Sequence, residues 1–203
     1  MSKKIFIVFG HHDTKTSFNA AIRDTFVSEA ENLGHEVDIV NLFDEKEQLP
    51  FYDSRVNPPP QLVIDYRKRL EQADVMFLIG SCNNLRLNVI LENWVDWVLH
   101  PKWFFSYRSM FPDSRFFKKY GCSVPGAMKG KQAIISLTYG EPIMSCYNFA
   151  LFGDMTLRRV KKLAFNLGGM STRYISFYSV LPNMPEAVFN KHIKKVIDLA
   201  RSL

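Results

Sequence analysis

The chain has 203 residues, of which 47% are hydrophobic and 23% charged, a balance typical of a globular protein that excludes an intrinsically disordered chain. No apolar run approaches the ~20 residues that a membrane-spanning helix needs, so no membrane span is expected. The formal net charge of +6 comes from short clusters inside helical patterns, and without a recognition motif it does not predict nucleic-acid binding.

Apolar runs typical of buried strands alternate with helical patterns along most of the chain. The predicted elements, in chain order, are strand 4–9, helix 18–33, strand 36–42, helix 61–72, strand 74–80, helix 85–99, strand 132–138, helix 155–167, strand 172–180 and helix 185–201. Gly34 marks the end of the first helix and Pro185 the start of the last. Residues 100–128 are rich in aromatics, prolines and glycines without a clear period, which predicts an irregular excursion over the surface or a lid.

Five strands, each followed by a helix, predict a parallel sheet with helices on both faces. Right-handed crossovers leave few topologies for such a chain. The leading one is an α/β fold of the flavodoxin-like type, a doubly wound five-stranded parallel sheet. No internal repeat or second domain is found, so residues 1–203 are expected to form a single flavodoxin-like domain.

In a doubly wound sheet, ligands bind beyond the carboxyl ends of the strands. This rule selects three loops, at residues 10–17, 81–85 and 138–147. The first offers the hydroxyls of Thr14, Thr16 and Ser17 at the start of a helix, where unpaired N–H groups and the helix dipole favour a phosphate. His12 and Lys15 would add charge or hydrogen bonds. The alternative that Thr16 or Ser17 is only an N-cap stays open.

Other kinds of site are disfavoured. Neither a P-loop nor a Gly-x-Gly-x-x-Gly fingerprint is present, and no Gly-x-Ser-x-Gly elbow supports a hydrolase. Adjacent side chains diverge at His11, His12 and Asp13, and without a second ligand cluster no metal site is expected. Widely spaced cysteines, odd in number, together with an N-terminal apolar run too short for a signal peptide, lead us to expect a cytoplasmic protein.

The segment from His12 to Asn19 resembles the His-x-x-x-x-Ser-Phe-Asn opening of the NAD(P)H:quinone oxidoreductase family. Further stretches agree with that family, at residues 34–42, 94–98, 129–140 and 153–155, so the resemblance covers nearly the whole chain. It implies a flavodoxin-like fold, FAD or FMN as cofactor, and NAD(P)H as co-substrate.

The resemblance also implies site residues. The cofactor would be held by the first loop (His12, Thr16, Ser17, Phe18, Asn19), the second loop (Ser81, Cys82, Asn84, Leu85) and the third loop (Thr138, Tyr139, Gly140, Glu141). Tyr147 lies near the family's catalytic tyrosine if a one-residue shift is allowed, and Tyr107 corresponds to an aromatic wall over the substrate pocket. Phe18, Asn19, Gly140 and Tyr107 also have structural readings, as a helix anchor, a first-turn polar residue, a turn glycine and a core aromatic.

The chain departs from the family at the ring side of the site. The family's second loop carries a proline and two aromatic residues that cradle the flavin, whereas residues 81–85 here read Ser-Cys-Asn-Asn-Leu. A stacked aromatic contact contributes ~1 kcal/mol beyond burial, so the loss of two weakens ring retention. Glu141 places a carboxylate beside the expected ring, and Phe152 replaces the histidine that partners the family's tyrosine.

Two functions fit these features. The first is a flavin-dependent NAD(P)H oxidoreductase that transfers a hydride through flavin N5 to quinones or similar two-electron acceptors. The second is a flavodoxin-like regulatory or binding module with weakened or lost flavin binding, such as an ancillary subunit. The family is usually homodimeric, and Trp94, Trp97 and the 100–128 excursion are candidates for the interface, although both tryptophans also suit a buried core helix.

Overall fold

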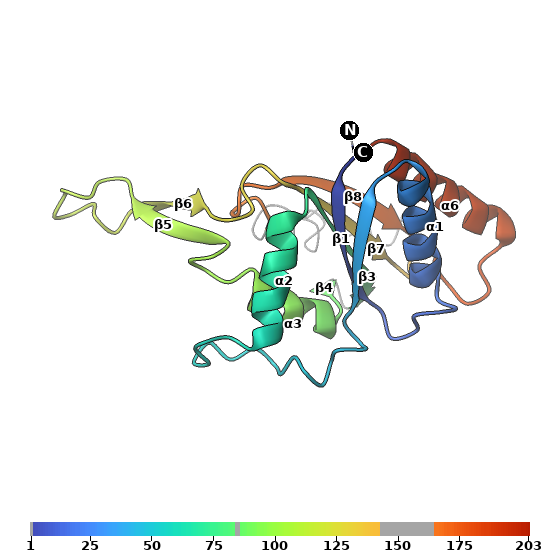
Figure 1. Ribbon diagram of the computed structural model, residues 1–203, viewed down its shortest axis with the longest axis horizontal. Helices are drawn as coiled ribbons and strands as arrows, with labels where there is room; N and C mark the ends of the chain where they lie inside the picture. Colours follow the sequence, from blue (N-terminus) through green and yellow to red (C-terminus); the bar gives the residue numbers. More distant parts are fainter. Residues whose placement is uncertain (1, 84–85, 143–164) are drawn as a thin grey trace.

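The computed structural model describes residues 2–83, 86–142 and 165–203. It contains a parallel sheet in the order β2 (Glu36–Asn41), β1 (Lys4–Gly10), β3 (Val75–Asn83), β7 (Gln132–Thr138) and β8 (Ser171–Phe177). Helices α1 (Phe18–Asn32) and α6 (Glu186–Arg201) cover one face, and α2 (Gln61–Gln72) and α3 (Val89–Val98) cover the other (Figure 1). The predicted doubly wound, flavodoxin-like sheet is confirmed.

Strand β1 shows why the apolar run has no polar alternation. Its residues 5–9 are all at most 1% exposed, because both faces of the sheet are covered. Phe6 and Val8 pack into the core beneath α2 and α3, whereas Ile5, Ile7 and Phe9 pack into the core beneath α1 and α6. The period of two along the strand therefore distributes one continuous apolar run between two cores.

The helix ends follow from capping residues. The Ser17 hydroxyl accepts from the Ala20 N–H at 3.1 Å at the start of α1, and Gly34, with φ of 80°, follows its end. The Asn88 side chain accepts from the Leu91 N–H at 3.2 Å at the start of α3. The sequence analysis predicted that this helix starts at residue 85, whereas it begins at Val89, after its cap.

The reason for the later start is an extended segment in front of the cap. Strand β3 continues to Asn83 instead of ending at residue 80, and it pairs antiparallel with the short strand β4 (Arg86–Leu87). The expected open loop at residues 81–85 is therefore partly strand. Apolar periodicity did not reveal this extension because Ser81, Cys82 and Asn83 are polar or small.

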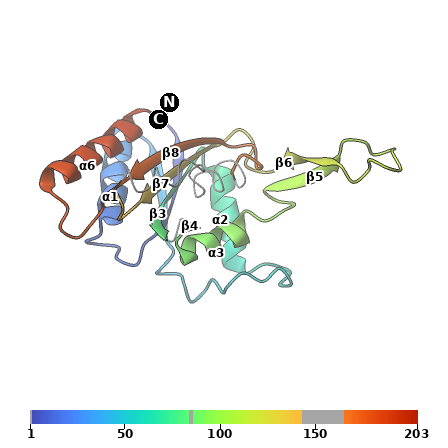
Figure 2. The ribbon, with the colours of Figure 1, turned by 180° about the vertical axis from the view of Figure 1, so that it is seen from behind.

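Residues 100–128 are not irregular as expected. They contain an antiparallel hairpin of β5 (Phe105–Ser109) and β6 (Gly121–Pro125), which projects beyond α2 and α3 in both views (Figures 1 and 2). Large apolar side chains are exposed along the hairpin and at its tip, so no alternation marks its strands: Tyr107, Met110, Phe111, Phe116, Phe117, Tyr120 and Val124. The predicted helix 155–167 lies almost wholly outside the described residues.

Trp94 and Trp97 of α3 are 0% and 2% exposed, and both belong to the core beneath α2 and α3. The core reading of these residues therefore holds, and their side chains are not available to an interface. None of the helices among the described residues is both long and apolar enough to cross a membrane.

Candidate functional site

The carboxyl ends of three strands meet at one edge of the sheet. Gly10 of β1 is in register with Gly80 of β3, and Ser81 is in register with Thr138 of β7. A groove of about 850 Å³ lies at this edge, between the loop before α1 and the connection from β8 to α6. Eight residues of the predicted cofactor set line it: Thr16, Ser17, Phe18, Asn19, Ser81, Cys82, Thr138 and Gly140.

Four of the other predicted residues lie outside the groove, and three are not among the described residues. The side chains of His12, Tyr107, Tyr139 and Glu141 are not among those that line the groove. Tyr107 is 71% exposed on the projecting hairpin, and Glu141 is exposed at the end of β7. Three further predicted residues, Asn84, Leu85 and Tyr147, fall outside the described residues, as does Phe152.

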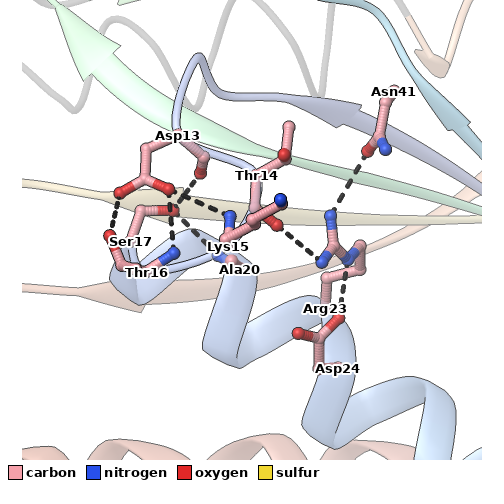
Figure 3. Close-up of polar contacts among 9 residues, drawn as sticks. All are labelled: Asp13, Thr14, Lys15, Thr16, Ser17, Ala20, Arg23, Asp24 and Asn41. Atoms are coloured by element: carbon pink, nitrogen blue, oxygen red, sulfur yellow. Dashed lines mark hydrogen bonds and ion pairs between the residues drawn. The ribbon is translucent and has the colours of Figure 1, made fainter. Parts of the chain in front are cut away.

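The loop between β1 and α1 is organised around a carboxylate (Figure 3). Asp13 Oδ1 accepts hydrogen bonds from the backbone N–H groups of Lys15 at 2.9 Å and Thr16 at 2.8 Å. The Thr16 hydroxyl donates to the other carboxylate oxygen. This hydroxyl and the two N–H groups hold the pKa of the Asp13 carboxyl well below its usual range. The loop thus already has an anion on its donors.

The rest of the loop is tied down by side chains (Figure 3). The Ser17 hydroxyl donates to the Asp13 carbonyl at 2.6 Å while it caps α1. Arg23, one turn into α1, donates to the Thr14 carbonyl at 2.9 Å, and its guanidinium lies over the Phe9 ring at 4.6 Å. The loop is therefore braced from the helix and from the strand, which fixes the direction of its N–H groups.

Both adjacent histidines line a neighbouring pocket, but His11 also lines the groove. His11 lines the groove, and its Nδ1 accepts from the Asp13 N–H at 3.2 Å. Burial lowers the pKa of His11, so the neutral, hydrogen-bond-accepting form is favoured. His12 is exposed and lines a neighbouring pocket of about 510 Å³, where its ring lies 6.2 Å from that of Phe43. Sequence reasoning selected His12, whereas the structure brings His11 to the groove.

Asn19 and Thr138 join the two walls of the groove. They are 3% and 5% exposed, and the Asn19 amide donates to the Thr138 hydroxyl at 3.1 Å. This bond fixes the first turn of α1 to the end of β7, across 119 residues of sequence. The polar groups of both side chains therefore satisfy each other, and their first role is structural.

Phe18 anchors the same turn of α1. Its ring packs edge-on against Phe177 and Phe189 at centroid distances of 5.5 Å, and only part of it reaches the groove. The structural role predicted for Phe18 is thus confirmed, and its contact with a cofactor stays a prediction.

The opposite end of the groove includes Thr138 and Gly140 at the carboxyl end of β7. Tyr139 is buried and stacks on Tyr178 at 5.0 Å, so its side chain faces the core. Among the described residues, a Cβ on Gly140 would meet only Leu181 Cδ2, at 3.9 Å. Among the described residues, neither close packing nor a positive φ requires glycine at position 140. Close approach of a ligand to the backbone would require it.

Sequence reasoning missed one side of the groove. The β8–α6 connection and the first turn of α6 supply a largely apolar wall of Val180, Leu181, Pro182, Met184 and Phe189. The signal was available, because this connection also follows a strand's carboxyl end. No group of three or more metal-ligating side chains occurs in the described part of the chain.

A family model described as the flavodoxin-like fold matches residues 3–199. The chain belongs to this flavodoxin-like family. The predicted resemblance is thereby confirmed, and the groove lies where a flavodoxin-like sheet places its ligand. No match was found among curated protein sequences.

Solved structures show the same flavodoxin-like fold over the whole chain. An NAD(P)H:quinone oxidoreductase from Methanothermobacter marburgensis is 15% identical, with a TM-score of 0.77 over 100% of this chain and 97% of that one. An FMN-dependent NADH-azoreductase from Bacillus anthracis, in complex with FMN, is 15% identical, with a TM-score of 0.74 over 100% and 99%. The general stress protein 14 from Treponema denticola, in complex with FMN, is 14% identical, with a TM-score of 0.67 over 98% of each chain.

Proposed function

We propose that this protein is a flavin-dependent NAD(P)H oxidoreductase that transfers a hydride to quinones or similar two-electron acceptors. The observation that carries the proposal is the groove of about 850 Å³ at the carboxyl edge of the sheet, lined by β1–α1, β3, β7 and β8–α6. The names of the similar structures, a quinone oxidoreductase and an FMN-dependent azoreductase among them, support the same class of activity. FMN or FAD is the proposed cofactor.

The ring end of the groove fits a flavin. Gly140 offers backbone without a side chain, Ser81 and Cys82 lie at the neighbouring strand end, and Leu181 and Pro182 provide an apolar wall. We assign these residues to holding the ring and excluding water from it. When bound, the flavin supplies the chemistry, accepting a hydride at N5 from NAD(P)H and passing it to the acceptor.

Two tyrosines and the oligomeric state complete the proposal. Tyr107 lies on the projecting strand β5 and does not line the groove of its own chain. It can therefore form a wall over a substrate pocket only in the groove of another copy, and we propose a homodimer. The catalytic assignment of Tyr147 stays a proposal taken from the family resemblance.

A regulatory or binding module with weakened flavin binding is the second candidate. Two observations favour it: a carboxylate occupies the donors of the first loop, and residues 81–83 carry no aromatic ring for stacking. This candidate predicts a protein that stays colourless with either flavin.

The deciding experiment is spectroscopic. The purified protein is incubated with FMN or FAD, desalted, and reduced anaerobically with NADPH or NADH; we expect a yellow protein that bleaches and regains its colour when benzoquinone is added. Steady-state rates should give parallel double-reciprocal lines. Gly140→Val should abolish the colour, whereas Ser171→Val, which adds bulk at the opposite edge of the sheet, should not. A wild-type protein that retains neither flavin contradicts the enzyme and supports the module.

A further inference from the structure

The pocket of about 510 Å³ beside the groove shares three lining residues with it, His11, Ser81 and Asn83. Its other walls come from the connection between β2 and α2, at residues 42–51, and from the start of α3, at residues 88–93. Small-molecule sites commonly have volumes of ~300–1,000 Å³, so this pocket is large enough for a ligand of its own. Because Ser81 lies at the end of the groove assigned to the flavin ring, such a ligand would lie beside that ring.

Hydrogen bonds hold the two main walls of this pocket together. The Asn93 side chain of α3 donates to the Pro50 carbonyl at 3.0 Å and accepts from the Tyr52 N–H at 2.7 Å. The Trp97 indole, one turn further along α3, donates to the same carbonyl at 2.8 Å. The β2–α2 connection is therefore fixed on α3 without a ligand, and little conformational entropy is lost when one binds.

The lining of the pocket is mostly apolar and partly aromatic. Leu42 and Leu49 are buried, whereas Phe51 and Val89 are 80% and 62% exposed. Exposed apolar side chains that line one cavity gain burial when an apolar ligand occupies it, and that burial stabilises the complex. The rings of Phe43 and Phe51 favour a flat aromatic ligand, because aromatic rings stack on or pack edge-on against one another.

The charge in the pocket has one sign. Lys46 lines it, and no aspartate or glutamate does so among the described residues. Lys46 has acidic neighbours in the sequence, but none of them lines the pocket, and the Glu45 carboxylate accepts from the Tyr66 hydroxyl. Within the described part of the chain, the Lys46 ammonium forms no ion pair. An acidic group on a ligand would therefore meet a lysine that has no carboxylate partner in the protein.

We propose that this pocket is the acceptor site and that it selects planar aromatic acceptors with an acidic substituent, such as sulfonated or carboxylated quinones. The inference rests on the proposed oxidoreductase function and deepens it by naming the acceptor class. The acceptor's rings would lie against Phe43 and Phe51, and its acidic group would pair with Lys46. The quinone receives the hydride that NAD(P)H has given up, takes one proton from water and leaves as the hydroquinone, while NAD(P)H becomes NAD(P)⁺.

The first test compares two acceptors that share a ring system and differ in charge, 9,10-anthraquinone-2-sulfonate and 2-(hydroxymethyl)-9,10-anthraquinone. Oxidation of NADPH or NADH is measured anaerobically with each, and kcat/KM for the sulfonate is divided by that for the neutral quinone. In Lys46→Met this ratio should fall about tenfold, because a charge-assisted contact is lost. Lys129→Met removes an exposed lysine that lines neither the pocket nor the groove, and the ratio should stay as in the wild type.

The second test concerns the aromatic wall. Phe51→Ser removes a ring that lines the pocket and is 80% exposed, and kcat/KM should fall about fivefold for both quinones. Phe116→Ser removes a ring that is 79% exposed on the hairpin and lies outside the pocket, so both values should change less than twofold. Binding of the sulfonate to each protein is measured in parallel by isothermal titration calorimetry, which does not require turnover.

Distinct outcomes separate the two proposals. A ratio that Lys46→Met leaves unchanged overturns the selection of acidic acceptors and leaves the oxidoreductase intact. Equal losses in Phe51→Ser and Phe116→Ser overturn the pocket as the acceptor site. A protein that retains no flavin, and yet binds the sulfonate in a manner that Lys46→Met weakens, overturns the oxidoreductase and with it the acceptor role.

Discussion

The two ends of the groove differ in how far their backbone groups already have partners within the chain. At the tail end, beside α1, the Asp13 carboxylate accepts from the N–H groups of Lys15 and Thr16, while Ser17 and Arg23 donate to loop carbonyls (Figure 3). At the ring end, Gly140 presents backbone with one described neighbour near its missing Cβ. The end with the stronger sequence motif is thus the end at which some of the donors already have an acceptor within the chain. A motif shows that donors are present, whereas only the structure shows whether they are free.

Helix α3 packs directly against two glycines near the carboxyl ends of β1 and β3. A Cβ on Gly10 or on Gly80 would lie 2.3 Å or 2.2 Å from a side-chain carbon of Leu91 in α3. Both glycines therefore let a side chain of α3 pack closely against the sheet. Among the described residues, no such packing applies at Gly140, whose Cβ would meet only Leu181 Cδ2 at 3.9 Å.

The largest expected effect tests this difference between the glycines. Gly80→Ala forces a Cβ into Leu91, and we expect it to lower the free energy of unfolding by about 3 kcal/mol, the upper range for overpacking. Gly140→Ala should change it by less than about 0.5 kcal/mol, as for an exposed site. Urea unfolding of both variants measures the difference. Equal losses in the two would mean that Gly140 is also held by packing.

The next effect concerns the bond that links the two ends. Asn19→Ala removes the amide that pairs with the Thr138 hydroxyl, and leaving that hydroxyl buried without its partner should cost about 2 kcal/mol of unfolding free energy. Thr138→Val should cost a similar amount. In Asn19→Ala/Thr138→Val neither polar group remains, so the loss should be smaller than the sum of the two single losses.

A double-mutant cycle by urea unfolding measures this coupling. Strictly additive losses of unfolding free energy would show that Asn19 and Thr138 stabilise the fold independently. Both residues would then be assigned to ligand binding alone. The flavin affinity of the double variant adds a second readout, because residues that only link the walls should affect it less than Gly140→Val does.

The elements predicted from the sequence are those with a single clear period. Helix α2 and strand β7 have the predicted bounds, because their apolar residues repeat in one pattern that burial enforces. The β5–β6 hairpin was missed, since exposed rings such as Tyr107 and Phe117 remove the alternation that marks a strand. Its position outside the sheet depends on tertiary contacts that no local pattern contains.

The sequence predicted where the site lies but not which way its side chains point. The rule for strand ends selected the segments that hold Thr16, Ser81 and Gly140, all of which line the groove. It did not tell His11 from His12, because the direction of a loop side chain depends on backbone angles that sequence spacing does not fix. It also gave no sign that Asp13 would fold back onto the donors, since an aspartate suits either a solvent-exposed loop or a turn that it closes.

The smallest expected effect is a pH dependence of the free energy of unfolding, which arises from a buried histidine beside Phe18. His192 of α6 is 7% exposed and packs against the rings of Phe18 and Phe177; burial lowers its pKa from 6.5. The neighbouring Lys191 and Lys195 lower it further, whereas the bond between its Nε2 and the Tyr178 carbonyl opposes the shift. The folded state thus favours the neutral ring.

The sign of the pH effect follows from this shift. The stabilising contribution of neutral His192 is present above the unfolded-state pKa and is lost as the pH falls through the folded-state pKa, because the unfolded chain binds the proton more readily. The free energy of unfolding should therefore decrease from about pH 8 to about pH 5. In His192→Phe, which keeps a ring beside Phe18 and cannot be protonated, the decrease should be smaller. Identical slopes of unfolding free energy against pH in the two proteins would contradict this prediction. They would show that His192 is protonated as readily in the folded as in the unfolded chain.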